Sequence, residues 1–151
     1  ATLDADGQND PTDLLTLVER LRAEPTLAAV VGYRVRRADT RWKVVQSRIA
    51  NAVRNRITGD VIRDTGCPLK ALRRDVAQRL PRFDGMHRFI PTLIRVQGGT
   101  VIEMPVSHRA RRAGASKYGM RDRALRGLTD ALAVRWYRRR ALDYEITEEI
   151  A

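Results

Sequence analysis

The spacing of apolar residues over the first third of the chain predicts two helices with a strand between them. Apolar side chains recur every three or four residues from 11 to 23, which predicts a helix that begins at Pro11 with Asp10 as its N-cap. The nearly all-apolar stretch that ends at Gly32 predicts a buried strand. Helical spacing returns from Arg41 to Ile57, where one apolar stripe lies opposite a polar face.

The rest of the chain continues this alternation of helices and strands. Residues 70–80 and 86–97 have helical spacing, and the second of these helices is expected to be interrupted near Pro91. Two glycines then lead into TVIEMPVSH, residues 100–108, whose alternating pattern predicts a strand. Helical spacing resumes from Arg121 to Arg140, before an acidic tail. The sequence therefore indicates an α/β layered fold.

The helix expected over residues 121–140 combines an apolar stripe with many arginines. The stripe consists of Leu125, Leu128, Leu132 and Trp136. The arginines near it are Arg121, Arg126, Arg135 and Arg138–Arg140. Such a helix can lie on an anionic bilayer, but a helix packed on its own domain or on a partner subunit has the same pattern. Both interpretations stay open at the level of the sequence.

The charge balance implies a partner that carries negative charge. The 151-residue chain has 29 Lys and Arg against 18 Asp and Glu, a formal net charge of +11. A nucleic acid, an anionic membrane surface or a phosphorylated substrate would each fit this excess. Aromatic residues make up only 5% of the chain, with no pattern for stacking on RNA bases. A basic nucleic-acid-binding module, or a peripheral membrane module without catalysis, is the alternative to an enzyme.

The N-terminal segment LDADGQND offers oxygen ligands at alternate positions. In extended backbone, alternate side chains point the same way, so Asp4 and Asp6 can face one cation, and Gln8 continues the spacing. Mg²⁺ commonly takes one or two carboxylates and completes its shell with water and substrate phosphates. Solvated acids near the start of a helix would produce the same pattern, because the helix dipole favours them there.

Cations gather in two other places. Arg34 lies at the end of the expected buried strand. Lys43 and Ser47 lie one turn apart on the polar face of the next helix. A loop rich in small residues carries Arg109, Arg111, Arg112 and Lys117. Guanidinium groups suit phosphate oxygens, although each of these residues also fits a solvated basic face.

The cysteine and histidine residues do not indicate a catalytic nucleophile or a zinc site. Cys67 is the only cysteine, so no disulfide forms within the chain, and it has no evident catalytic partner. His87 and His108 lack the spacing of zinc ligands.

Four motifs occur in an order that resembles the family 2 glycosyltransferases. They are LDADGQNDP, DTGCPLKALRRDV, GMHRFIPTLIRVQGGTVIEMPVSHRAR and GASKYG. The similarity is to the branch that contains dolichyl-phosphate mannose synthase and bacterial polyprenyl-phosphate glycosyltransferases, and it runs from Asp4 to about Arg138. A D-x-D alone is a weak match, whereas four ordered motifs are a strong one.

This resemblance implies a fold, a reaction and a set of site residues. The fold is the Rossmann-like GT-A type, and the reaction moves a sugar from a nucleotide diphosphate donor to a polyprenyl phosphate at a membrane surface, with inversion at the anomeric carbon. By motif matching, Asp4, Asp6 and Gln8 hold Mg²⁺ or Mn²⁺ against the donor diphosphate. Asp64 matches the acidic position near the reacting sugar, where we assign it a positioning or electrostatic role before that of a base.

The resemblance also implies how the phosphates are held. Arg34, Lys43 and Ser47 match positions near the acceptor phosphate. Lys117 and either Arg111 or Arg112 match the cations of a loop over the donor phosphates. With a phosphorylated lipid as its partner, the protein is expected at the cytoplasmic face of a membrane or in the cytoplasm, and nucleic acid is not expected as a partner.

The chain departs from the family pattern at its N-terminus. Family members carry nucleotide-binding strands before the D-x-D, and this sequence begins without them. We therefore expect residues 1–120 to be the C-terminal part of a GT-A catalytic domain, and residues 121–151 to be a basic helix and acidic tail at a membrane surface or oligomer interface. A sheet without its first strands exposes an edge and apolar surface, which favours a homo-oligomer.

Overall fold

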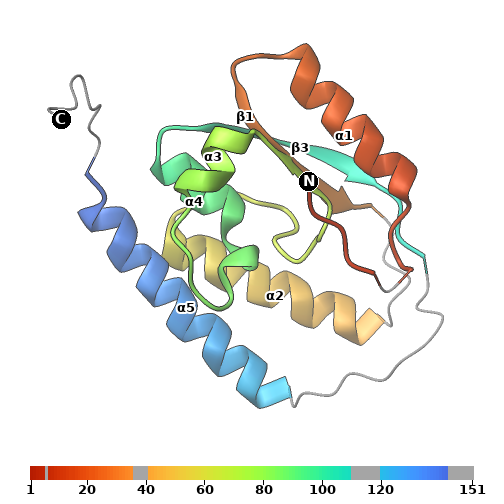
Figure 1. Cartoon of the computed structure of the whole chain (residues 1–151). Helices are drawn as coiled ribbons and strands as arrows, with labels where there is room; N and C mark the ends of the chain where they lie inside the picture. The colour runs from red at the N-terminus through yellow and green to blue at the C-terminus, as the bar shows by residue number, and fades with distance from the viewer. Residues whose placement is uncertain (6, 36–40, 110–119, 143–151) are drawn as a thin grey trace, which may run out of the picture.

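The computed structural model describes residues 1–5, 7–35, 41–109 and 120–142, and its core is a three-stranded sheet between two layers of helices (Figure 1). The strand order is β2-β1-β3. The strands are β1 (Leu27–Arg34), β2 (Lys70–Leu72) and β3 (Thr100–Val106). The helices are α1 (Pro11–Ala23), α2 (Arg41–Thr58), α3 (Arg74–Arg79), α4 (Ile90–Val96) and α5 (Met120–Arg140), with a 3₁₀ turn, η1 (Met86–Arg88). This arrangement confirms the expected α/β fold.

Strand β1 is the central element of the sheet. It pairs antiparallel with β2 and parallel with β3. Helix α1 covers one face of the sheet, while α4 and α5 cover the other. Because both faces are covered, the strand is apolar along nearly its whole length, as the sequence predicts.

Two apolar clusters hold the layers together. On the α1 side, Leu17 and Leu21 pack with Val30 of β1. On the other side, Phe89 and Leu93 are fully buried in a larger cluster that includes residues of α5. Helix α5 is therefore part of the domain core, even though it is the last helix of the chain.

The helix ends follow the polar signals in the sequence. The Asp10 carboxylate accepts a hydrogen bond from the backbone N–H of Thr12 at 3.1 Å, which confirms the predicted N-cap of α1. Helix α2 ends before Gly59, which has a positive φ of 68°. Arg138 of α5 donates to the carbonyls of Thr58 and Gly59 at 2.6 and 3.0 Å, so a cation also satisfies the C-terminal end of α2.

The helix predicted over residues 70–80 is wrong. Residues 70–72 form β2, and the helix begins only at Arg74. Backbone hydrogen bonds decide the difference, because Lys70 pairs with Thr2 on one side and with β1 on the other. The pairing of Thr2 with Lys70 is an isolated bridge outside the three strands. The expected break near Pro91 is present: the chain passes from η1 to α4 at Phe89.

The apolar stripe of α5 does not face the core. Leu125, Leu128, Leu132 and Trp136 are between 43% and 64% exposed. The helix packs instead through Ala131 and Val134, which are 1% and 2% exposed. Small side chains on the inner face allow close packing, and the larger apolar residues remain on the outer face.

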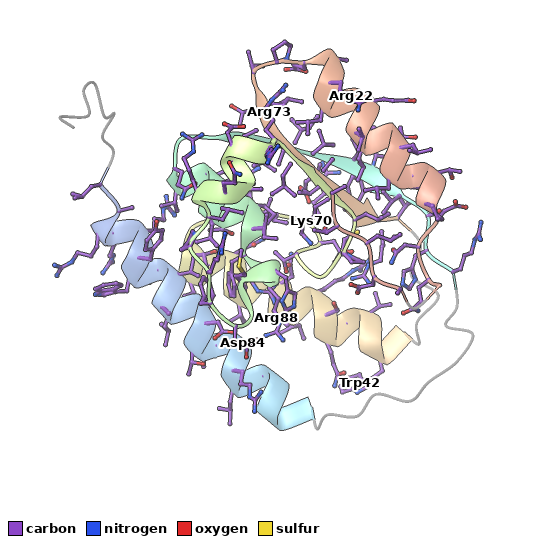
Figure 2. All side chains as sticks on the ribbon, viewed as in Figure 1. Arg22, Trp42, Lys70, Arg73, Asp84 and Arg88 are labelled. Atoms are coloured by element: carbon purple, nitrogen blue, oxygen red, sulfur yellow. The ribbon has the colours of Figure 1, made fainter. Side chains whose placement is uncertain are left out.

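Arg73 ties three elements together, and its replacement tests this role. Its guanidinium donates to the carbonyls of Leu27, Leu21 and Glu24 at 2.7, 3.0 and 3.1 Å, where α1 ends and β1 begins (Figure 2). We expect Arg73→Gln to lower the free energy of unfolding by about 2–3 kcal/mol, because these carbonyls lose a charged donor. Urea unfolding followed by circular dichroism measures this. The matched control is Arg74→Gln, an exposed neighbour, and equal midpoints for both variants would contradict the role.

Candidate functional site

The candidate site is built around an ion pair at the carboxyl end of β1. Arg34 is the last residue of that strand, and its Nε and Nη2 donate to the two carboxylate oxygens of Asp64 at 2.7 and 2.9 Å. The backbone N–H of Arg34 also donates to Asp64, at 3.3 Å. Both side chains are 12% exposed. Two residues that the motifs assign to different roles are thus joined in a bidentate contact that fixes the orientation of both.

Asn51 of α2 positions the loop that carries Asp64. Its side-chain amide donates to the carbonyls of Ile62 and Arg63 at 2.6 and 3.0 Å. Its carbonyl oxygen accepts from the Thr65 hydroxyl at 2.9 Å. One side chain therefore binds the loop on both sides of Asp64.

Glu103 of β3 holds the same loop from the other direction. Its carboxylate accepts a hydrogen bond from the backbone N–H of Arg63 at 2.9 Å. Burial raises the pKa of Glu103, while its bonds to backbone N–H groups act in the opposite sense. Asn51 lies outside the four motifs, and Glu103 lies within the third motif without being distinguished there. The role of each depends on contacts between distant segments, which the sequence pattern does not show.

A cavity of about 320 Å³ opens beside the ion pair. It lies between the carboxyl end of β1, helix α2 and the loop that carries Asp64. Its charged and hydroxyl-bearing lining residues include Arg34, Ser47, Arg48, Arg54, Arg63 and Asp64. Arg34, Ser47 and Asp64 thus line one cavity, whereas the side chain of Lys43 lies outside the described part of the structure. With four arginines and one carboxylate, the cavity suits an anion.

The N-terminal segment lies beside the start of the basic loop. The backbone carbonyl of Gln8 accepts from the N–H of Arg109 at 2.8 Å, and the guanidinium of Arg109 forms an ion pair with Asp10. Asp13 accepts from the N–H of Ser107 at 2.8 Å, so α1 also binds the end of β3. The residues expected near a metal and the entry to the cationic loop are therefore neighbours. Asp6, Arg111, Arg112 and Lys117 lie outside the described residues.

Lys70 is a buried cation that the sequence analysis does not single out. It is 4% exposed, and its Nζ donates to the carbonyl of Cys67. Burial lowers the pKa of Lys70, and the negative charges of Asp4 and Asp64 act in the opposite sense. Lys70 thus lies within electrostatic reach of both acids, near the centre of the molecule (Figure 2). A lysine in the apolar run PLKAL is the signal that could have revealed it.

A divalent cation would have to be held mainly by the N-terminal segment. Asp4 is exposed and Gln8 is half-buried, and both offer the hard oxygens that Mg²⁺ and Mn²⁺ prefer. Among the residues that the structure describes, no group of three or more His, Cys, Asp or Glu side chains could hold a metal ion. The expected metal site, which includes Asp6, therefore stays a prediction.

Comparisons with known proteins agree with the motifs. The family model for Glycosyl transferase family 2 matches residues 1–81. The chain is 38% identical over 142 residues to dodecaprenyl-phosphate galacturonate synthase of Rhizobium johnstonii, a match that covers 92% of this chain and 41% of that protein. It is 36% identical over 119 residues to undecaprenyl-phosphate 4-deoxy-4-formamido-L-arabinose transferase of Sodalis glossinidius, covering 79% of this chain and 36% of that protein. No solved structure matches the chain significantly. The chain thus spans about two fifths of the length of these curated relatives.

The thiol of Cys67 provides a test of how tightly the loop beside the site is packed. The side chain is 1% exposed, and burial raises the pKa of the thiol. The thiolate is the reactive form of cysteine. We therefore expect Cys67 in the native chain to react with iodoacetamide at least about 100-fold more slowly than Cys67 in the chain unfolded in urea, at every pH from about 7 to 9. Mass spectrometry of quenched samples measures both rates. Equal rates in the native and unfolded chains would contradict this packing.

Proposed function

Because the chain belongs to glycosyl transferase family 2, we propose that the protein containing it moves a sugar from a nucleotide diphosphate donor to a polyprenyl phosphate, with inversion at the anomeric carbon. The observation that carries this proposal is the cationic cavity at the end of β1, which gathers Arg34, Ser47 and Asp64. The alignments with two relatives cover most of this chain, and the names of both relatives include a polyprenyl phosphate. The cavity would receive the acceptor phosphate.

The ion pair supports a positioning role for Asp64. A phosphate monoester is already anionic at neutral pH, so the acceptor needs no strong base to become a nucleophile. Both Asp64 oxygens already accept hydrogen bonds from Arg34. In this scheme Asp64 holds the Arg34 guanidinium at the cavity wall, and its negative charge faces the sugar carbon on which positive charge develops.

The N-terminal segment would serve the donor. Asp4, Asp6 and Gln8 would hold Mg²⁺ or Mn²⁺, which stabilises the negative charge on the departing nucleotide diphosphate when it is bound. Lys117 and Arg111 or Arg112 would cover the same phosphates. The support for this arrangement is the contact of Gln8 and Asp10 with Arg109, at the start of the basic loop.

Two neighbouring helices would place the cavity at a membrane surface. Helices α2 and α5 pack together, and both leave large apolar side chains exposed. On α2 these are Trp42, Val45, Ile49 and Val53. Exposed arginines of α5, such as Arg126 and Arg139, would meet anionic headgroups. No helix in the described part of the chain is long and apolar enough to cross a bilayer.

The transfer reaction is tested with the protein that contains these residues. Radiolabelled nucleotide diphosphate sugars, supplied one at a time with undecaprenyl phosphate and Mg²⁺, should yield labelled lipid with one of them, and EDTA should abolish the transfer. We expect Asp64→Asn to lower kcat about 100-fold or more, because the cation at the cavity wall loses its orienting charge. The matched control is Asp75→Asn, an exposed carboxylate on α3. Transfer at the unmodified rate in Asp64→Asn would reject this role.

Vesicle sedimentation tests the membrane surface. We expect Leu128→Ser with Leu132→Ser to weaken partition onto vesicles of phosphatidylglycerol and phosphatidylcholine at least about fivefold, because apolar area no longer enters the interface. Leu15→Ser is the control, since Leu15 is 63% exposed on α1, across the sheet. An oligomer that dissociates in the double variant, with vesicle binding unchanged, would instead assign this face to the expected homo-oligomer.

A further inference from the structure

The cavity contains a half-buried cation that forms no ion pair with a carboxylate of the described residues. Arg34 already forms its bidentate pair with Asp64. Arg48 and Arg63 are exposed, so water solvates them. Arg54 is half-buried, and among the residues that the structure describes no carboxylate forms an ion pair with it. Of the four arginines that line the cavity, Arg54 therefore combines partial burial with the lack of an ion pair in the described part of the chain.

The contacts of Arg54 fix its position without neutralising it. Its Nη1 donates to the side-chain oxygen of Asn51 at 3.1 Å, and its guanidinium carbon lies 5.7 Å from the centre of the buried Phe89 ring. Its Nε is buried and has no hydrogen-bond partner among the residues that the structure describes. Burial lowers the pKa of Arg54, Arg88 lowers it further, and only Asp64 opposes the shift. A buried donor without a partner calls for an acceptor.

We propose that Arg54 binds the phosphate monoester of the acceptor, as a ligand additional to the residues implied by the family motifs. This inference rests on the proposed function. Arg54 lies seven residues after Ser47, so both side chains face the cavity from the same side of α2. A phosphate dianion there would balance the charge of Arg54 and accept hydrogen bonds from a guanidinium that Phe89 and Asn51 already orient. Arg34, whose charge Asp64 balances, would shape the site more than attract the anion.

Binding of geranyl phosphate, measured by calorimetry on the protein that contains these residues, tests the role of Arg54. We expect Arg54→Gln to weaken binding about 10-fold to 100-fold, and Arg54→Lys to weaken it less. Arg56→Gln, an exposed arginine on the same helix that does not line the cavity, should bind like the unmodified protein. Equal affinity in Arg54→Gln and Arg56→Gln would overturn the proposal.

A second measurement keeps the test decisive if Arg54→Gln does not fold. In nitrogen-15 spectra of the unmodified protein, the Arg54 Nε–H signal should move on saturation with geranyl phosphate, and an unmoved signal would overturn the proposal. A loss of uridine diphosphate binding in Arg54→Lys, with geranyl phosphate binding retained, would place Arg54 with the donor and would also overturn it.

The same experiments separate this inference from the proposed function. If sugar transfer occurs at the same rate in Arg54→Gln as in the unmodified protein, the inference fails and the proposed function stands. If geranyl phosphate binding depends on Arg54 but no nucleotide diphosphate sugar supports transfer, the proposed function fails while the phosphate site remains.

Discussion

The burial of β1 on both faces is the constraint on which the rest of the structure depends. A strand between two helical layers cannot carry polar side chains along its length, so its chemistry is confined to its ends. Arg34 is the first charged residue of β1 and lies at its carboxyl end. The parallel partner β3 ends at the same edge of the sheet. The ion pair, the cavity and the entry to the basic loop therefore gather at one edge, where ligands of open α/β sheets bind.

Local patterns were sufficient to predict most of the elements. The N-cap at Asp10, the buried strand and the long helices all follow from signals within a few residues, and the structure confirms them. The short segment at Lys70 was mistaken for a helix, because three residues cannot show a period and their strand depends on pairing with Thr2 and β1. Periodicity likewise located the apolar stripe of α5 but could not show that Ala131 and Val134, with their small side chains, form the packed face.

The motifs named candidate residues for the site, but they did not show how these residues are related. Arg34 and Asp64 were assigned separately, to an acceptor phosphate and to a reacting sugar, and the structure shows them bound to each other. The roles of Asn51 and Glu103 could not be identified from the sequence. Their side chains hold a loop from other elements, and only the folded chain brings those segments together. Lys70 was missed for the same reason, since its burial comes from the sheet.

Part of the positive charge of the chain, which first indicated a polyanionic partner, serves structural roles. Arg73 and Arg138 donate to backbone carbonyls at helix ends, and Arg95 balances the nearly buried carboxylate of Asp60. These guanidinium groups satisfy acceptors that folding would otherwise leave without partners. The net charge of +11 therefore overstates the surface available to a nucleic acid. What distinguishes the cavity is one half-buried guanidinium, Arg54, that forms no ion pair with any carboxylate of the described residues. A single cation of this kind suits a compact phosphate better than an extended polyanion.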